Sequence, residues 1–211
     1  MNLGRKLEMS FKAYGKTLKL ELSFDTVLRM YDLQQSDEAD EDKVDVSLRL
    51  LVKNYRAIQK WPLAIKAQTL NEIFGKFIIT DKKAPKDEMK TVDFLQDAKY
   101  IYASFMTDYG IDLYEQQGKL DWRKFIALFG GLSAKTKIRD VIAIRAMEIP
   151  NPNEDPKVAR AKQIQELQKA KAYYALEISA EESEQNVQKG LAQLFGTLSA
   201  QAKAGENGVR R

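Results

Sequence analysis

Apolar residues recur at the spacing of an α-helix along most of this 211-residue chain. The pattern is clearest from Asp93 to Tyr109, where apolar positions follow one face at 3.6 residues per turn. Gly110 comes directly after this segment, and glycine at that position commonly ends a helix in a left-handed conformation. Because only 11 glycines and 5 prolines interrupt the chain, we predict a mainly α fold.

The N-terminal residues follow a different period. Apolar and polar residues alternate from Leu7 to Ala13 and again from Leu18 to Phe24, on either side of a turn that contains Gly15. Alternation on both sides of a short glycine-containing turn predicts a β-hairpin with one apolar face. Because an isolated hairpin is barely stable in water, we expect it to pack against the helices that follow.

Three prolines divide the chain near its C-terminal quarter. Pro150, Pro152 and Pro156 lie so close together that no regular helix crosses this segment. We take these prolines as a hinge that divides a core from an arm. The four predicted segments are a hairpin plus helical core domain (1–149), a proline-rich hinge (150–156), a C-terminal helical arm (157–203) and a disordered tail (204–211).

The predicted arm carries two apolar stripes. One recurs at spacings of three and four residues between Lys157 and Ile178, and the other follows a capping-box pattern at 179–182. One interpretation is a helical hairpin that packs on its own domain. The other is an arm that binds a helix of a second copy or of a different protein. The candidate partner-binding residues of the two stripes are Ile164, Leu167, Tyr174, Leu191, Leu194 and Leu198.

Arg145 interrupts the apolar stripe of a helix predicted from Ser133 to Ile149. A buried guanidinium without a partner is very costly, so we predict that Arg145 forms a structural ion pair. The alternative is that Arg145 recognises a carboxylate of a partner protein. The candidate partners within the chain are Asp108, Asp112 and Asp121.

The composition excludes several classes of enzyme. The chain has no cysteine and no histidine, which excludes thiolate nucleophiles, Ser-His-Asp triads and histidine or cysteine zinc sites. No glycine-rich phosphate-binding motif is present. A carboxylate pair could hydrolyse a glycoside, but acidic residues also commonly occupy helix ends, so we expect no enzymatic activity, no metal and no cofactor. The carboxylates considered for this role are Asp108, Asp112, Glu115 and Asp121.

The charges of the chain are mixed in sign. It carries 34 Lys and Arg residues against 30 Asp and Glu residues, without the concentrated basic face of a nucleic-acid-binding protein. An acidic run from Ser36 to Asp45 is expected to be a solvated loop. No apolar run approaches the roughly 18 residues that span a membrane, and the N-terminus lacks the apolar region of a signal peptide. We therefore expect no nucleic-acid partner, no membrane and a cytoplasmic location.

Several separate blocks of the sequence form a recognisable set when they are taken in order. They are Ser23-Phe24-Asp25 after the hairpin, DAKYIYASF (97–105), YGIDL (109–113), LDWRKF (120–125), Gly131-Leu132, Thr136-Lys137 and RAM (145–147). In this order they resemble a family of siphophage tail proteins, and the resemblance covers about residues 16–174. The genes of that family lie immediately upstream of the tape-measure gene in phages and prophages of Gram-positive bacteria.

The family is regarded as tail assembly chaperones, and the resemblance implies a mostly helical protein without enzymatic activity. It implies that the chain binds the tape-measure protein and keeps this long, apolar-striped helical chain soluble during tail assembly. It also implies a homo-oligomer that acts in the host cell cytoplasm and is absent from the mature virion. The alternatives are a structural tail or connector protein of the virion and a nucleic-acid-binding regulator.

Overall fold

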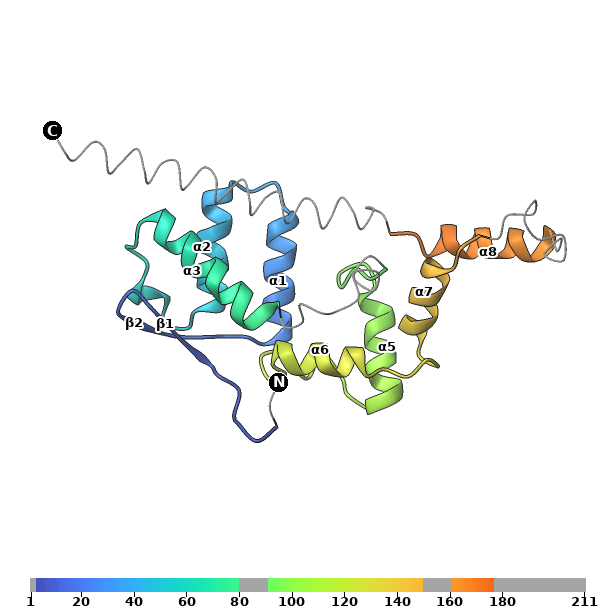
Figure 1. Cartoon of the computed structure of the whole chain (residues 1–211), viewed down its shortest axis with the longest axis horizontal. Helices are drawn as coiled ribbons and strands as arrows, with labels where there is room; N and C mark the ends of the chain where they lie inside the picture. The colour runs from blue at the N-terminus through green and yellow to red at the C-terminus, as the bar shows by residue number, and fades with distance from the viewer. Residues whose placement is uncertain (1–2, 80–90, 150–160, 177–211) are drawn as a thin grey trace. The chain divides into compact units, whose positions relative to one another are not determined.

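The computed structural model describes residues 3–79, 91–149 and 161–176, which Figure 1 draws in colour. These residues contain seven α-helices and one two-stranded antiparallel sheet at the N-terminus. The prediction of a mainly α fold with an N-terminal β-hairpin is therefore confirmed. None of the helices in these ranges is long and apolar enough to cross a membrane.

The described residues form two compact units, and the first is discontinuous in sequence. It combines residues 3–79 with residues 114–128, whereas the second combines residues 91–113, 129–149 and 161–176. This grouping differs from the single core and separate arm expected from the sequence. The expected hinge, the arm beyond residue 176 and the C-terminal tail lie outside the described residues.

The hairpin of the first unit pairs β1 (Ser10–Ala13) with β2 (Lys16–Lys19). The two turn residues, Tyr14 and Gly15, have positive φ angles of 46° and 74°. Two residues with positive φ make the turn type that matches the twist of the flanking strands, and glycine adopts this conformation at no steric cost. The alternation of the strands then buries Leu18 on the inner face of the hairpin.

The helices of the first unit are α1 (Phe24–Gln35), α2 (Asp40–Leu51) and α3 (Leu63–Ile73). A short 3-10 turn, η1 (Tyr55–Ala57), joins α2 to α3, and a π-helical turn, η2 (Phe74–Ile78), follows α3. Helix α2 packs against both α1 and α3. Their inner faces supply most of the core, including Val27, Met30, Leu48, Leu51, Leu70 and Ile73.

Residues 114–128 return to this unit and include the start of α6 (Trp122–Gly130). The backbone N–H of Trp122 donates to the carbonyl of Leu22 at 2.7 Å, and its indole Nε1–H donates to the carbonyl of Ile78 at 3.0 Å. Asp121 caps the first turn of α6 by accepting the backbone N–H of Arg123 at 2.9 Å. The two hydrogen bonds of Trp122 attach this part of the chain to the segment that follows β2 and to η2.

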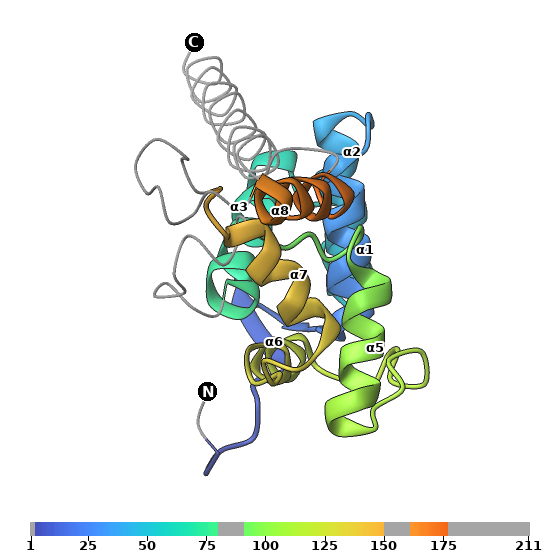
Figure 2. The same cartoon turned by 90° about the vertical axis from the view of Figure 1, so that its right-hand side faces the viewer.

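The second unit contains α5 (Ala98–Tyr109), α7 (Lys137–Ala146) and α8 (Ala161–Tyr173). Helix α5 ends as predicted at Gly110, which has a φ of 61° and donates its N–H to the carbonyl of Met106 at 3.1 Å. Figure 2 shows α5 beside α7, and α8 crossing the C-terminal end of α7. Helix α8 lies in the segment expected to be a separate arm, yet it belongs to the same unit as α5 and α7.

A partly buried polar network connects α2, η1 and α3 in the first unit. The ammonium of Lys66 lies 2.5 Å from a carboxylate oxygen of Asp45, and the hydroxyl of Tyr55 donates to the same oxygen. Burial alone would raise the pKa of Asp45, but the hydrogen bonds from Lys66 and Tyr55 and the charges of Lys66 and Arg49 outweigh it and lower that pKa.

The lowered pKa predicts an acid-sensitive contribution to stability. The contribution is complete above the usual pKa of an aspartate, about 3.9, and is lost as the pH falls through the lowered value. Replacing Asp45 with asparagine should therefore lower the free energy of unfolding by about 1 kcal/mol near pH 7 and by less below about pH 4. Urea denaturation between about pH 3 and pH 7 measures this difference.

The matched control for this prediction is Asp32→Asn, which changes an exposed carboxylate on α1. Its effect on the free energy of unfolding should be small at neutral pH. The prediction for Asp45 is wrong if the Asp45→Asn variant and the wild type differ by the same amount across the whole pH range.

Candidate partner-binding site in the second unit

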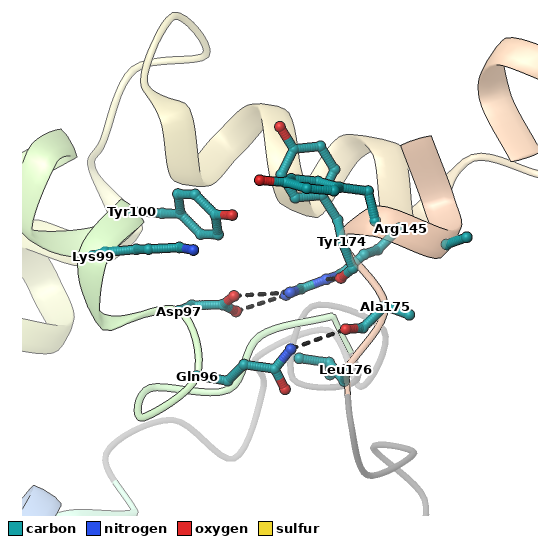
Figure 3. Close-up of a pocket in the computed structure, with 10 residues that line it drawn as sticks. Gln96, Asp97, Lys99, Tyr100, Arg145, Tyr174, Ala175 and Leu176 are labelled. Atoms are coloured by element: carbon teal, nitrogen blue, oxygen red, sulfur yellow. Dashed lines mark hydrogen bonds and ion pairs between the residues drawn. The ribbon is translucent and has the colours of Figure 1, made fainter. Parts of the chain in front are cut away.

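A buried ion pair joins the start of α5 to the end of α7 in the second unit. Arg145 lies in the last turn of α7, and Asp97 lies directly before α5. Their side chains are 7% and 0% exposed. The guanidinium binds the carboxylate through two hydrogen bonds, from Nη1 to Oδ2 at 2.6 Å and from Nη2 to Oδ1 at 2.8 Å (Figure 3). This two-pronged geometry is the strongest form of an arginine–carboxylate contact.

The same guanidinium also holds two other segments. Nη1 of Arg145 donates to the carbonyl of Thr91 at 2.7 Å, and Nε donates to the carbonyl of Tyr174 at 2.6 Å. Gln96 strengthens the second attachment, because its side-chain amide donates to the carbonyl of Ala175 at 2.9 Å (Figure 3). The chain that leaves α8 is therefore fixed, through its backbone carbonyls, to α7 and to the segment directly before α5.

The predicted ion-pair partners of Arg145 were wrong, because Arg145 pairs with Asp97 and not with any of the three expected aspartates. Asp108 accepts the backbone N–H of Ser133 at 2.6 Å, and Asp121 pairs with Arg123 at 2.7 Å. The remaining candidate, Asp112, accepts the hydroxyl of Tyr102 at 3.3 Å. Helices α5 and α7 run in opposite directions, so the end of α5 that carries Asp108 lies beside the start of α7, whereas Arg145 lies at its far end.

Lys171 attaches α8 to the end of α7. Its ammonium donates to the carbonyls of Arg145 at 2.7 Å and Met147 at 2.5 Å. The last carbonyls of a helix have no partner within that helix and carry partial negative charge, so a cation stabilises them. The spacing of residues along the chain did not predict the contacts of Lys171, Gln96 or Asp97. Lys171 could have been found from the sequence, because it is a charged residue on the apolar face of α8.

The candidate residues on α8 and directly after it are only partly covered. Ile164, Leu167 and Tyr174 are half-buried, and among the described side chains of α8 none is fully buried. Tyr174 packs edge-on against Tyr100, with ring centroids 5.8 Å apart, and its hydroxyl accepts a hydrogen bond from Lys137 at 2.8 Å. The candidate residues of the second stripe, Leu191, Leu194 and Leu198, lie outside the described residues.

The chain matches the protein family described as "Bacteriophage Gp15 protein" over residues 3–176. It belongs to this family. A search of curated proteins and a search of solved structures found no match to this Gp15-family protein. The family match ends at Leu176, so it includes the ion pair and α8 but not the second stripe of the expected arm.

An open cavity of about 560 Å³ lies beside the ion pair of this Gp15-family protein. Its walls include Lys99 and Tyr100 of α5 and the segment that follows α8 (Figure 3). The ammonium of Lys99 lies over the ring of Tyr100, 4.8 Å from its centroid. Asp97 and Arg145 bind each other, and Arg145 also binds two backbone carbonyls of the same unit. Among the described residues, no group of three or more acidic, histidine or cysteine side chains could hold a metal ion.

Proposed function

We propose that this Gp15-family protein is a tail assembly chaperone that binds the tape-measure protein and keeps it soluble, without catalysis. The observation that carries the proposal is the half-buried apolar stripe of α8, at Ile164 and Leu167. A helix that was needed only for packing would normally hide its apolar face against its own core. A partly covered stripe instead suits reversible contact with an apolar helix of another protein.

The way in which α8 is held supports this proposal. Polar contacts from Lys171 and Arg145 attach the end of α8 to the unit through backbone carbonyls. The apolar side chains of the helix are therefore not all required to keep it in place. Exposed apolar side chains nearby enlarge the surface, since Met147 is 50% exposed and Tyr173 is 74% exposed. Such a surface is typical of a protein-binding site.

On this proposal the protein is a homo-oligomer in the host cell cytoplasm. It binds neither nucleic acid nor a membrane, and it is absent from the finished virion. The mixed surface charge of the chain would keep a complex with an apolar partner in solution.

Co-expression with the tape-measure protein tests the proposal. The wild-type chain should raise the soluble fraction of the tape-measure protein and elute with it on size exclusion. Replacing Ile164 and Leu167 with glutamate should abolish both effects, because charge on the stripe opposes burial against an apolar partner. The matched control is Gln165→Glu, which adds a charge at an exposed position of the same helix. Circular dichroism should show equal helix content in all three proteins.

Two outcomes would contradict the proposal. One is a tape-measure protein that is equally soluble alone, and the other is no complex with the wild-type chain. Mass spectrometry of purified virions provides a separate check, because a stoichiometric amount of the chain would support a structural tail or connector protein instead.

A further inference from the structure

The register of the hairpin decides which backbone groups of β1 bond to β2. The amide of Leu20 donates to the carbonyl of Met9 at 2.8 Å, so Met9 belongs to the set that bonds across the hairpin. Bonded and non-bonded pairs alternate along antiparallel strands. The residues that alternate with Met9 therefore direct their N–H and C=O groups away from β2. These residues are Glu8, Ser10 and Lys12.

The outer edge of β2 is covered by the loop that follows α2. The N–H of Lys53 donates to the carbonyl of Lys19 at 2.8 Å. The side chain of Asn54 accepts the N–H of Lys19 at 2.7 Å and donates to the carbonyl of Thr17 at 3.0 Å. An amide side chain and a neighbouring backbone thus complete the hydrogen bonds of this edge, which removes it as a template for another strand.

The outer edge of β1 is open at its centre. Arg123 binds the carbonyl of Glu8, with Nη2 at 3.1 Å from the oxygen. Within the part of the chain that the structure describes, the outward N–H and C=O groups of Ser10 and Lys12 have no hydrogen-bond partner. Both residues are exposed, and the neighbouring Met9 is 41% exposed. An exposed strand with unpaired backbone groups is able to accept another strand.

We propose that β1 pairs with β1 of a second copy of this chain, antiparallel and centred on Ser10, to form one continuous four-stranded sheet. The pairing deepens the self-association in the proposed function but does not depend on tape-measure binding. In this register Ser10 faces the same residue of the second copy, and Glu8 faces Lys12 in both directions. Every outward backbone group then lies opposite another outward group, as a two-fold symmetric contact requires. The carbonyl of Glu8 has two lone pairs, so it can accept from Lys12 of the second copy and keep its bond from Arg123.

The charges on the edge favour this register over the alternatives. Opposite charges that face each other across antiparallel strands stabilise the pair, whereas like charges destabilise it. Parallel pairing in register would place Glu8 beside Glu8 and Lys12 beside Lys12. Sliding the antiparallel register by two residues would separate Glu8 from Lys12 and leave one bonded pair fewer. On the inner face, the antiparallel register also brings the exposed Met9 beside Phe11 of the second copy.

A single cysteine tests the pairing directly, because the chain contains none. Residues that face each other in a bonded antiparallel pair have Cα atoms about 5.5 Å apart, within the range of about 4.4–6.8 Å that a disulfide spans. Under mild oxidation Ser10→Cys should give a covalent homodimer at least about tenfold faster than Thr17→Cys. Thr17 is an exposed residue on the same face of the hairpin but lies on the covered edge.

Charge reversal in the Ser10→Cys background tests the register. Lys12→Glu should slow dimer formation about tenfold, because two attractive pairs become repulsive. Adding Glu8→Lys should restore it. Since Glu8 also pairs with Lys76 at 2.9 Å, the melting temperature of each variant must be measured alongside. The proposal is overturned if Ser10→Cys crosslinks no faster than Thr17→Cys, or if charge reversal has no effect. Neither result bears on tape-measure solubility, which the co-expression experiment measures separately.

Discussion

Replacing Arg145 with methionine is expected to lower the free energy of unfolding of the second unit by about 3–5 kcal/mol. The change leaves the carboxylate of Asp97, which is 0% exposed, without its counter-ion. It also removes the donors that hold the carbonyls of Thr91 and Tyr174. Arg145→Lys should recover only part of the loss, because an ammonium cannot bind both carboxylate oxygens in the planar two-pronged geometry. Urea denaturation followed by circular dichroism measures these differences.

A surface ion pair provides the matched control. Arg29 pairs with Asp25 at 2.8 Å, but its side chain is 62% exposed, so Arg29→Met should cost less than about 1 kcal/mol. Replacing Asp97 with leucine in the Arg145→Met variant should restore part of the stability, because no buried charge then remains unpaired. The interpretation fails if Arg145→Met and Arg29→Met are equally stable.

The sequence could predict that Arg145 needs a partner, but it could not predict which carboxylate provides it. A charged residue on an apolar stripe is a local signal, and it requires no knowledge of the neighbouring helix. The choice of Asp97 depends on the antiparallel packing of α5 and α7. Ser104 illustrates the same packing, since its hydroxyl accepts the N–H of Ile138 near the middle of α5. Long-range pairings of this kind leave no trace in the spacing of residues along the chain.

The acidic run from Ser36 to Asp45 shows a different limit. The sequence predicted a solvated loop, which is wrong from Asp40 onwards because α2 begins there. Acidic residues are favoured in the first turn of a helix, where the unpaired N–H groups carry partial positive charge. The run therefore marks a helix start as well as a polar segment. Asp45 is then drawn into the network with Lys66, a contact that also depends on tertiary packing.

The hairpin was predictable because its signals are local, whereas the discontinuous first unit was not. Alternation and a turn with two positive φ angles lie within a short stretch around Gly15. By contrast, residues 114–128 join this unit through Trp122, whose backbone and side chain both bind segments far away in sequence. The apolar residues of α6 indicated burial, but not against which part of the chain.

Trp122 therefore carries the second large prediction, on the stability of the first unit. Its side chain is 3% exposed and packs against the rings of Tyr31 and Phe125. Trp122→Ala should lower the free energy of unfolding by about 3–5 kcal/mol, the usual effect of removing a large buried aromatic side chain. Trp122→Phe keeps most of the apolar contact but removes the donor to the carbonyl of Ile78, so it should cost about 1–3 kcal/mol.

The chain offers a matched control, because Trp61 is the second of its two tryptophans and is only half-buried. Trp61→Phe should cost less than about 1 kcal/mol, and it leaves Trp122 as the only indole fluorophore. The emission of that variant should shift to longer wavelength as urea exposes Trp122 to water. If Trp122→Phe were as stable as Trp61→Phe, the buried carbonyl of Ile78 would not depend on the indole. The hydrogen bond that ties α6 to η2 would then contribute nothing to holding residues 114–128 in the first unit.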